Sequence, residues 1–230
     1  LPRVDHRETS FSPAAFDATY RFITGKAPQT TAVQPAAPVV LNGKITGLGL
    51  QPTDPASGNY SNNLALPGAQ LAVFATDAVT GARLGNAVHQ KTVGTDGMWG
   101  PFTAQAGTPY EFVITAPGYA TTHIYRSPFV RSSQLIHMRA DRLAEADKTA
   151  RSSVTLTRPR GYFDAERDKM LFDGKALPGV PPTGAGVSNA KINLAVDGVR
   201  PISAEFNGEK ITGRTWPVAE NRLVVLELTY

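Results

Sequence analysis

The sequence predicts a mainly β protein, with two small β-sandwich or β-barrel-like domains preceded by one short helix. Apolar and polar residues alternate from Val39 to about Met138, which is the pattern of half-buried strands. The 21 glycines and 18 prolines are scattered along the chain, as in a protein with many turns. Apolar residues make up 41% of the 230 residues and charged residues 18%, so the chain is expected to fold into globular domains.

One helix is predicted, over residues 12–25. Ser12 suits the N-cap position, and Pro13 suits the first helical position, where its missing amide hydrogen needs no partner. Apolar residues then recur at helical spacing, and Gly25 is typical of a helix end. The recurring residues are Phe16, Tyr20 and Ile23. A lone short helix cannot bury such a face by itself, so we expect a part of the protein outside this sequence to cover it.

Residues 39–143 are predicted to form a β-sandwich of about 100 residues. The expected strands are residues 39–45, 69–75, 110–116, 119–125 and 133–138. Turn formers fill the segments between them, above all residues 46–68, which are predicted to be a long loop. A linker rich in proline, alanine and threonine, residues 29–38, precedes this domain.

Residues 144–230 are predicted to form a second small β domain. Asp197-Gly198 and Asn207-Gly208 are expected to be two-residue type I′ hairpin turns, because both central residues of such a turn need a positive φ. Residues 222–229, RLVVLELT, form a nearly continuous apolar run and are predicted to be the last strand.

The composition limits the possible partners and chemistry. The formal net charge of +4 is spread along the chain, and the tightest basic group is Lys148, Arg151, Arg158 and Arg160. We expect this group to be solvated and predict no nucleic-acid partner. The chain has no cysteine, which excludes disulfides, thiol nucleophiles and cysteine metal sites. No metal site and no cofactor are predicted, and no apolar run approaches the roughly 20 residues of a membrane helix.

His6 is the one candidate catalytic residue. It follows Asp5 in a polar stretch just before the predicted helix, an arrangement that closes many α/β-hydrolases. The alternative is a loop histidine with no part in catalysis. The remaining histidines, His89, His123 and His137, lie in strand-like stretches without metal-ligand spacing, and we expect them to be packed or solvated. The chain has no G-x-S-x-G motif and thus no recognisable serine nucleophile.

The stretch DHRETSFSPAAFDATYRFITGKAP, residues 5–28, resembles the end of the catalytic domain in bacterial and archaeal lipases of the α/β-hydrolase family. The resemblance implies that residues 1–28 end such a domain, with His6 as the base of a Ser-His-Asp mechanism. Asp5 matches the residue before the histidine and is not expected to be the triad acid. The serine, the acid and the parallel sheet would lie upstream, so this chain alone is not expected to hydrolyse an ester. Because it lacks a starting methionine and a signal peptide, we expect a processed product or a piece of a longer protein.

Residues 39–140 resemble the carboxypeptidase-regulatory, transthyretin-like β-sandwich in the motifs NGKITG, LPGAQLAVFATDAVTG, VGTDGMWGPF and YEFVITAPGYAT. This resemblance implies a fold and no activity. Some lipases of the family continue into a C-terminal β region that helps to cover the active site and bind the acyl chain. By resemblance, we expect the C-terminal region of a secreted or periplasmic lipase or other carboxylic-ester hydrolase, whose partners are an upstream α/β-hydrolase domain and an ester or lipid substrate.

Two other interpretations stay open. A non-catalytic, secreted β-sandwich that binds carbohydrate, polymer or protein explains residues 39–230 equally well, but it leaves the predicted helix unexplained. A structural domain that only spaces or stabilises an enzyme is not distinguished from a lipase part by the sequence. Aromatic residues near loops are candidates for lipid or polymer contact, although the core is the expected place for each. They are Tyr60, Trp99, Phe102 and Tyr119.

Overall fold

The protein is mainly β, as predicted, with a short helical part at the N-terminus. The structure is a computed structural model, and it describes residues 4–50, 59–180 and 186–229. The helices are α1 (Glu8–Phe11) and α2 (Pro13–Thr24), and two short 3-10 helices span Glu145–Asp147 and Val218–Glu220. The strands are β1 (Val39–Leu41), β2 (Ile45–Leu50), β3 (Asn59–Ala65), β4 (Gln70–Ala75), β5 (His89–Thr92), β6 (Phe102–Ala104), β7 (Tyr110–Thr115), β8 (Thr121–Arg126), β9 (Met138–Ala140), β10 (Ser152–Thr157), β11 (Met170–Phe172), β12 (Lys175–Ala176), β13 (Asn189–Leu194), β14 (Pro201–Phe206), β15 (Glu209–Arg214) and β16 (Arg222–Glu227).

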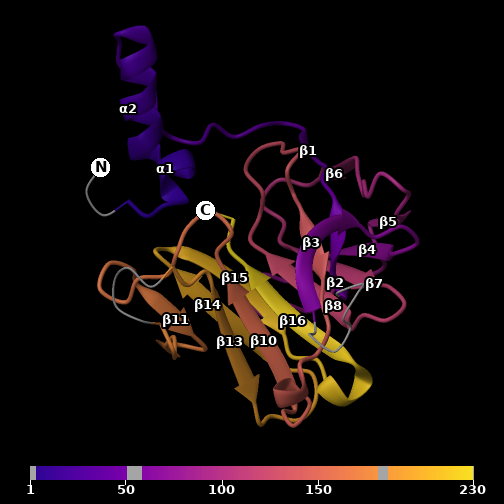
Figure 1. Cartoon of the computed structure of the whole chain (residues 1–230). Coiled ribbons are helices and arrows are strands. Elements are labelled where there is room, and N and C mark those ends of the chain that lie inside the picture. The colour runs from indigo at the N-terminus through magenta and orange to yellow at the C-terminus, as the bar shows by residue number, and fades with distance from the viewer. Residues whose placement is uncertain (1–3, 51–58, 181–185, 230) are drawn as a thin grey trace.

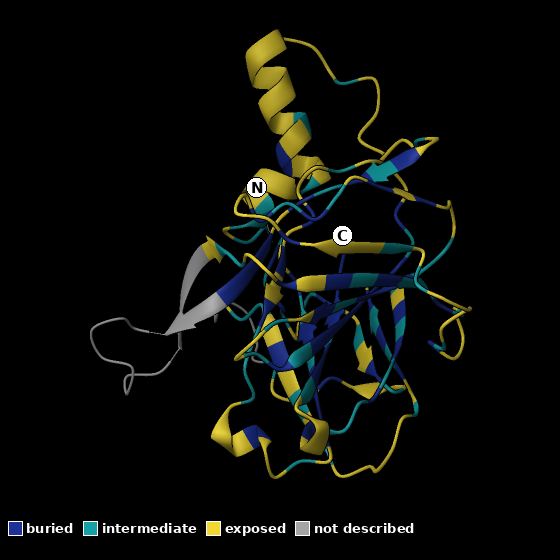
Figure 2. Cartoon of the chain, turned by 90° about the vertical axis from the view of Figure 1, so that its right-hand side faces the viewer, coloured by how far each residue is buried: buried dark blue, intermediate teal, exposed yellow. Residues whose placement is uncertain are grey.

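The predicted helix is confirmed as α2. The Ser12 hydroxyl accepts a hydrogen bond from the amide of Ala15 at 3.2 Å, and Gly25 ends the helix with a φ of +69°. Figure 1 shows α2 projecting away from the β body, with α1 at its base. Because it projects, α2 is exposed along its length and buries only Ala15 (Figure 2).

A seven-stranded sheet runs through both predicted β domains, in the order β13-β10-β16-β8-β7-β4-β5. Strand β16 lies inside this sheet and pairs in parallel with β8 on one side and with β10 on the other. Residues 39–143 and 144–230 therefore share one continuous sheet, while the boundary between them stays a prediction.

Two hydrophobic cores lie on opposite faces of this sheet. Side chains alternate across a strand, so Ile124 and Tyr125 of β8 point to different faces. Ile124 belongs to the core that the sheets β1-β6 and β3-β2-β9 cover, and Tyr125 belongs to the core that the sheet β12-β11-β14-β15 covers. Strands β8 and β16 are covered on both faces, which explains why residues 222–229 are apolar almost without interruption. The described strands thus form sandwich layers and no closed barrel.

One of the two predicted hairpins is confirmed and the other is wrong. Asn207 and Gly208 both have positive φ, +47° and +95°, and join β14 to β15. Asp197-Gly198 instead joins strands of two different sheets, because β13 pairs with β10 along its whole length and not with β14. A turn signal reports local backbone conformation, and it does not say which strand the flanking segment will pair with.

The predicted long loop at residues 46–68 is also partly wrong. Strands β2 and β3 occupy much of it and pair in antiparallel fashion, whereas residues 51–58 lie outside the described part. The strand expected at residues 133–138 begins only at Met138.

Candidate functional site

The N-terminal segment is attached to the C-terminal part of the chain by a cluster of charged groups, which we call the Asp5–Glu8 anchor. The Oδ2 atom of Asp5 accepts a hydrogen bond from the amide of Tyr162 at 2.6 Å. The Glu8 carboxylate lies between two guanidinium groups, with Arg158 at 2.5 Å and Arg167 at 2.9 Å. These side chains are largely buried, so the ion pairs are much less screened than pairs at the surface.

The same two carboxylates also shape the turn that contains His6. Asp5 Oδ1 accepts from the amide of Glu8, and a Glu8 oxygen accepts from the amide of Asp5, both at 2.9 Å. This reciprocal pair has the form of a capping box and closes the turn that precedes α1. Burial acts to raise the pKa of Asp5, but hydrogen bonds from the amides of Glu8, Tyr162 and Arg7 and the charge of Arg158 outweigh it and lower that pKa.

His6 lies in this turn with an exposed side chain. Its backbone carbonyl accepts from the hydroxyl of Thr9 at 2.6 Å, which fixes the turn. Within the described part of the chain, no hydrogen bond or ion pair involves its imidazole. Asp5 cannot orient the ring, because its carboxylate is turned into the Asp5–Glu8 anchor. The catalytic role of His6 stays a prediction.

The expectation of a solvated basic group is wrong for Arg158. Only 8% of this residue is exposed, because Asp5, Glu8 and the carbonyl of Tyr162 surround its guanidinium. Its partners Asp5 and Glu8 lie about 150 residues earlier in the chain, so a local charge pattern gives no sign of them. Lys148 and Arg151 are exposed, as expected, and pair with carboxylates at the surface.

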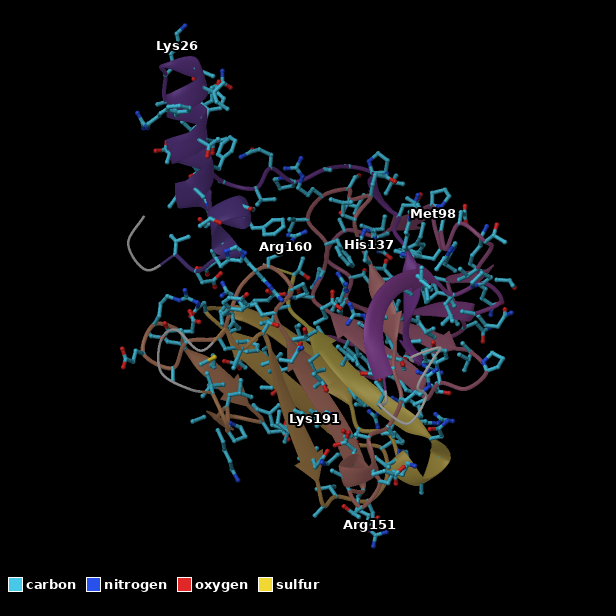
Figure 3. The ribbon with its side chains drawn as sticks, viewed as in Figure 1. Lys26, Met98, His137, Arg151, Arg160 and Lys191 are labelled. Atoms are coloured by element: carbon cyan, nitrogen blue, oxygen red, sulfur yellow. The ribbon has the colours of Figure 1, made fainter. Side chains whose placement is uncertain are left out.

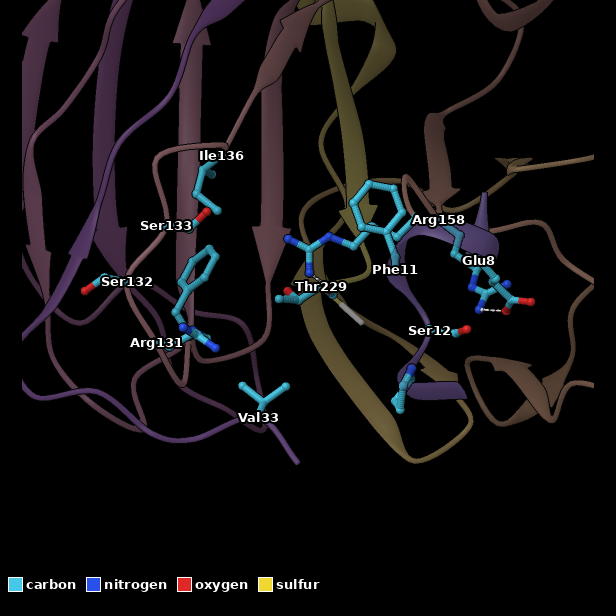
Figure 4. A pocket seen from close by; sticks show the side chains of 13 residues that line it. Glu8, Phe11, Ser12, Val33, Arg131, Ser132, Ser133, Ile136, Arg158 and Thr229 are labelled. Carbon is cyan, nitrogen blue, oxygen red and sulfur yellow. Dashed lines mark hydrogen bonds and ion pairs between the residues drawn. The ribbon is translucent and has the colours of Figure 1, made fainter. Parts of the chain in front are cut away.

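A cavity of about 480 Å³ lies where α1 and the linker meet the two β parts of the chain, residues 39–143 and 144–230. Figure 4 shows Val33, Arg131 and Ile136 on one side of it and Phe11 and Glu8 on the other. Figure 3 shows Arg160 at the place where the N-terminal helices approach the β body. Glu8 is only two residues from His6, so the cavity begins within one helical turn of the candidate catalytic residue. No local sequence pattern indicates this cavity, since its walls come from five separate segments of the chain.

A second group of polar residues lies on the face of the seven-stranded sheet where Tyr125 lies, with Glu111, His123 and Tyr125 buried and Arg83 at its exposed edge. This Glu111 cluster consists of Glu111, His123, Arg83, Tyr125 and Trp216. The Glu111 carboxylate accepts from Arg83 at 2.6 Å, from His123 at 2.7 Å and from the Tyr125 hydroxyl at 2.9 Å. Trp216 donates to the Tyr125 oxygen at 3.0 Å and stacks on His123 with ring centroids 4.3 Å apart. Because these side chains come from both β parts, the cluster joins them.

The remaining candidate side chains have structural partners. His89 Nε2 lies 3.0 Å from the carbonyl oxygen of Trp99, and His137 Nδ1 accepts from the amide of Lys44 at 3.0 Å. Trp99 and Phe102 are buried in the first core, as expected, and Tyr119 packs against it beneath the guanidinium of Arg142. The side chain of Tyr60 lies outside the described part.

Two kinds of site are missing from the part of the chain that the structure describes. No three histidine, aspartate or glutamate side chains there are grouped so that they could hold a metal ion. Neither α1, α2 nor any other described helix has the length and apolar character needed to cross a membrane.

Comparison with known proteins gives one family match and distant structural similarities. No curated protein matches the chain. A fimbrial protein from Bacteroides ovatus ATCC 8483 is 14% identical, with a TM-score of 0.26, over 86% of this chain and 51% of that one, so the chain spans about half of its length. The shaft pilin SpaA from Lactobacillus rhamnosus GG is 12% identical, with a TM-score of 0.29, over 83% of this chain and 97% of that one. Residues 37–143 match the family described as lipase C-terminal domain, which supports a lipase C-terminal region in this chain.

Proposed function

We propose that the chain is the C-terminal region of a lipase or other carboxylic-ester hydrolase, in which His6 is the general base. The observation that carries this proposal is the match of residues 37–143 to the lipase C-terminal domain family, directly after a segment with the expected histidine. The geometry of that segment agrees with such a role, because His6 is exposed in a turn that the Asp5–Glu8 anchor holds in place.

In the proposed mechanism, a serine of an upstream domain attacks the ester carbonyl. The imidazole of His6 takes the proton from the serine hydroxyl and then gives it to the leaving alcohol. An upstream acid would hold the opposite ring nitrogen. The anchor would contribute by fixing the backbone on both sides of His6, so that the imidazole meets the serine without a large loss of conformational freedom.

Helix α2 supports an upstream domain. Its apolar side chains are open to solvent, with Phe16 49% exposed, Tyr20 36% and Ile23 72%. In an α/β-hydrolase the last helix packs on the central sheet, and these three side chains would be buried there. We propose that the β parts then lie beside the active site and shape the space for the acyl chain. Export from the cytoplasm remains an expectation by resemblance.

The test is hydrolysis of a nitrophenyl ester by the complete protein, from source cells or expressed with its upstream domain. His6→Ala should lower kcat by about 10⁴-fold or more, because the serine loses its base. His137→Ala is the matched control, since His137 is exposed and lies on the sandwich, and it should keep kcat within about twofold. Unchanged hydrolysis by His6→Ala would remove His6 from the mechanism.

A second measurement tests the domain arrangement itself. An antibody against residues 39–230 should detect a protein much larger than 230 residues in source cells. A band at the size of this chain would instead favour a binding module that acts alone.

A further inference from the structure

The cavity between α1, the linker and the β parts has apolar walls and an excess of positive charge. Phe11, Pro13, Val33, Phe129 and Ile136 contribute apolar surface. Its charged residues are Glu8, Arg131, Arg158 and Arg160, which amounts to three cations against one anion. An apolar space with a few charged groups is the usual form of a binding site for an amphiphilic small molecule.

Two of the three guanidinium groups have no carboxylate partner among the residues that the structure describes. Glu8 and Arg158 neutralise each other within the Asp5–Glu8 anchor. Across the described residues, neither Arg131 nor Arg160 forms an ion pair. Arg160 donates to the carbonyl of Thr229 at 2.9 Å, and its guanidinium lies 5.7 Å from the ring centroid of Phe11. The charge of Arg160 also acts to lower the pKa of the buried Glu227, but the Glu227 carboxylate is already paired with Arg126.

The walls of the cavity are held in place. Phe129 and Ile136 are buried at 4% and 3% exposure, so this side of the cavity is part of the core. The linker is tied to the loop that follows β8, because the amide of Ala36 donates to the carbonyl of Val130 at 2.8 Å. The volume of about 480 Å³ falls in the range of roughly 300–1,000 Å³ that is typical of ligand cavities.

We propose that this cavity binds a long-chain fatty acid, with its carboxylate on the guanidinium groups of Arg131 and Arg160 and its acyl chain against Phe129 and Ile136. Guanidinium groups bind carboxylates through paired, charge-assisted hydrogen bonds, and the apolar walls suit a hydrocarbon chain. The proposal rests on the proposed function, because a fatty acid is the product that hydrolysis of a lipid ester releases. The site lies next to the His6 turn and is separate from the ester-cleaving groups.

The test is isothermal titration calorimetry on the 230-residue chain with dodecanoate below its micelle concentration. Dodecanol, dodecyltrimethylammonium and dodecyl phosphate, which carry the same alkyl chain, separate the effect of the head group. We expect one saturable site that binds dodecanoate at least about tenfold more tightly than dodecanol. The cationic amphiphile should bind no more tightly than dodecanol.

Three variants locate the site. Arg131→Gln combined with Arg160→Gln should remove the preference for dodecanoate and leave dodecanol binding unchanged. Arg151→Gln is the matched control, because Arg151 lies at the far end of the molecule from Arg160 (Figure 3). Val33→Trp should weaken both ligands by filling the cavity, and Val33 is exposed, so the chain should still fold.

Several results would overturn the proposal. Equal affinity for dodecanoate and dodecanol, or a double variant that keeps the preference, would exclude the carboxylate site. Absence of binding by every amphiphile would exclude the cavity as a ligand site. Tighter binding of dodecyl phosphate than of dodecanoate would exclude a fatty acid in favour of a phospholipid head group. These measurements do not depend on turnover, so binding that fails while His6→Ala still abolishes hydrolysis would refute only this inference.

Discussion

The carboxylate of Glu111 and the imidazole of His123 lie 2.7 Å apart in a place that solvent does not reach. A carboxylate only accepts, so Nδ1 of His123 carries the hydrogen of this bond. The opposite nitrogen, Nε2, is buried and finds no hydrogen-bond partner among the described residues, and the ring stacks on Trp216. The pair therefore holds a neutral imidazole at the contact between the two β parts.

Glu111→Ala should strongly destabilise the fold. The substitution leaves His123 and Tyr125 buried without their shared acceptor and removes the carboxylate partner of Arg83, which is partly exposed. We expect the free energy of unfolding, measured with urea, to fall by about 3–5 kcal/mol. Glu205→Ala is the matched control, because Glu205 pairs with Lys210 at the surface, and it should cost less than about 1 kcal/mol. Similar losses for both variants would contradict the structural role of Glu111.

Acid should destabilise the protein through the same pair. Burial lowers the pKa of His123 below its usual 6.5, although the contact with Glu111 opposes this effect and the charges of Arg222 and Arg83 add to it. Burial acts to raise the pKa of Glu111, but its bonds to His123 and Arg83 lower it below 4.5. As the pH falls, His123 and Glu111 therefore take up protons in the unfolded chain before they do so in the folded one. The free energy of unfolding falls as the pH drops below about 6.5 because of His123, and it falls further below about 4.5 because of Glu111.

Urea unfolding at about pH 7 and about pH 5 measures the share of His123 in this loss. His123→Gln keeps a donor for Glu111 and removes the titrating group, so its stability should change less over this interval. His6→Gln is the control, because the His6 side chain is exposed. Its free energy of unfolding should change between the two pH values as much as that of the parent chain. Equal changes in all three proteins would show that His123 is not the responsible group.

The sequence predicted local structure better than it predicted contacts between distant segments. The run at residues 222–229 was predicted as a strand, but its parallel pairing with β8 and β10 depends on segments far away in the chain. On their strands, Glu111 and His123 lie on the face opposite to the apolar Phe112 and Ile124. They are buried because Arg83 and Trp216 pack over that face. The pattern of residues within one strand does not show which distant side chains will pack against it.

The close packing of β15 on the seven-stranded sheet should make Gly213 intolerant of a side chain. A Cβ atom at this position would lie 2.7 Å from the Tyr125 ring and 2.8 Å from a methyl group of Leu226. Both neighbours are fully buried and cannot move away, so Gly213→Ala should cost about 1–3 kcal/mol in the free energy of unfolding. Gly94→Ala is the control, because Gly94 is exposed and its nearest neighbour is a surface carboxylate at 3.4 Å. Equal melting temperatures for the two variants would contradict this packing.

Trypsin should distinguish the anchored turn from the exposed helix that follows it. Arg21 and Lys26 lie in and just after α2, which makes few contacts with the body, so cleavage there needs little local unfolding. Arg7 lies inside the anchored turn, where its guanidinium contacts the carbonyl of Pro159 and the ring of Tyr162. Mass spectrometry should therefore find cleavage after Arg21 and Lys26 at least about tenfold faster than after Arg7.

Glu8→Gln supplies the matching variant, because it weakens the ion pairs with Arg158 and Arg167 that hold the turn. It should accelerate cleavage after Arg7 and leave the rates at Arg21 and Lys26 unchanged, so that the two α2 sites act as an internal control. If Arg7 is already cut as fast as Lys26 in the parent chain, the anchor does not hold the turn in solution. The His6 backbone would then have to be fixed by the upstream domain alone, and the contribution of the C-terminal part to positioning His6 would be refuted.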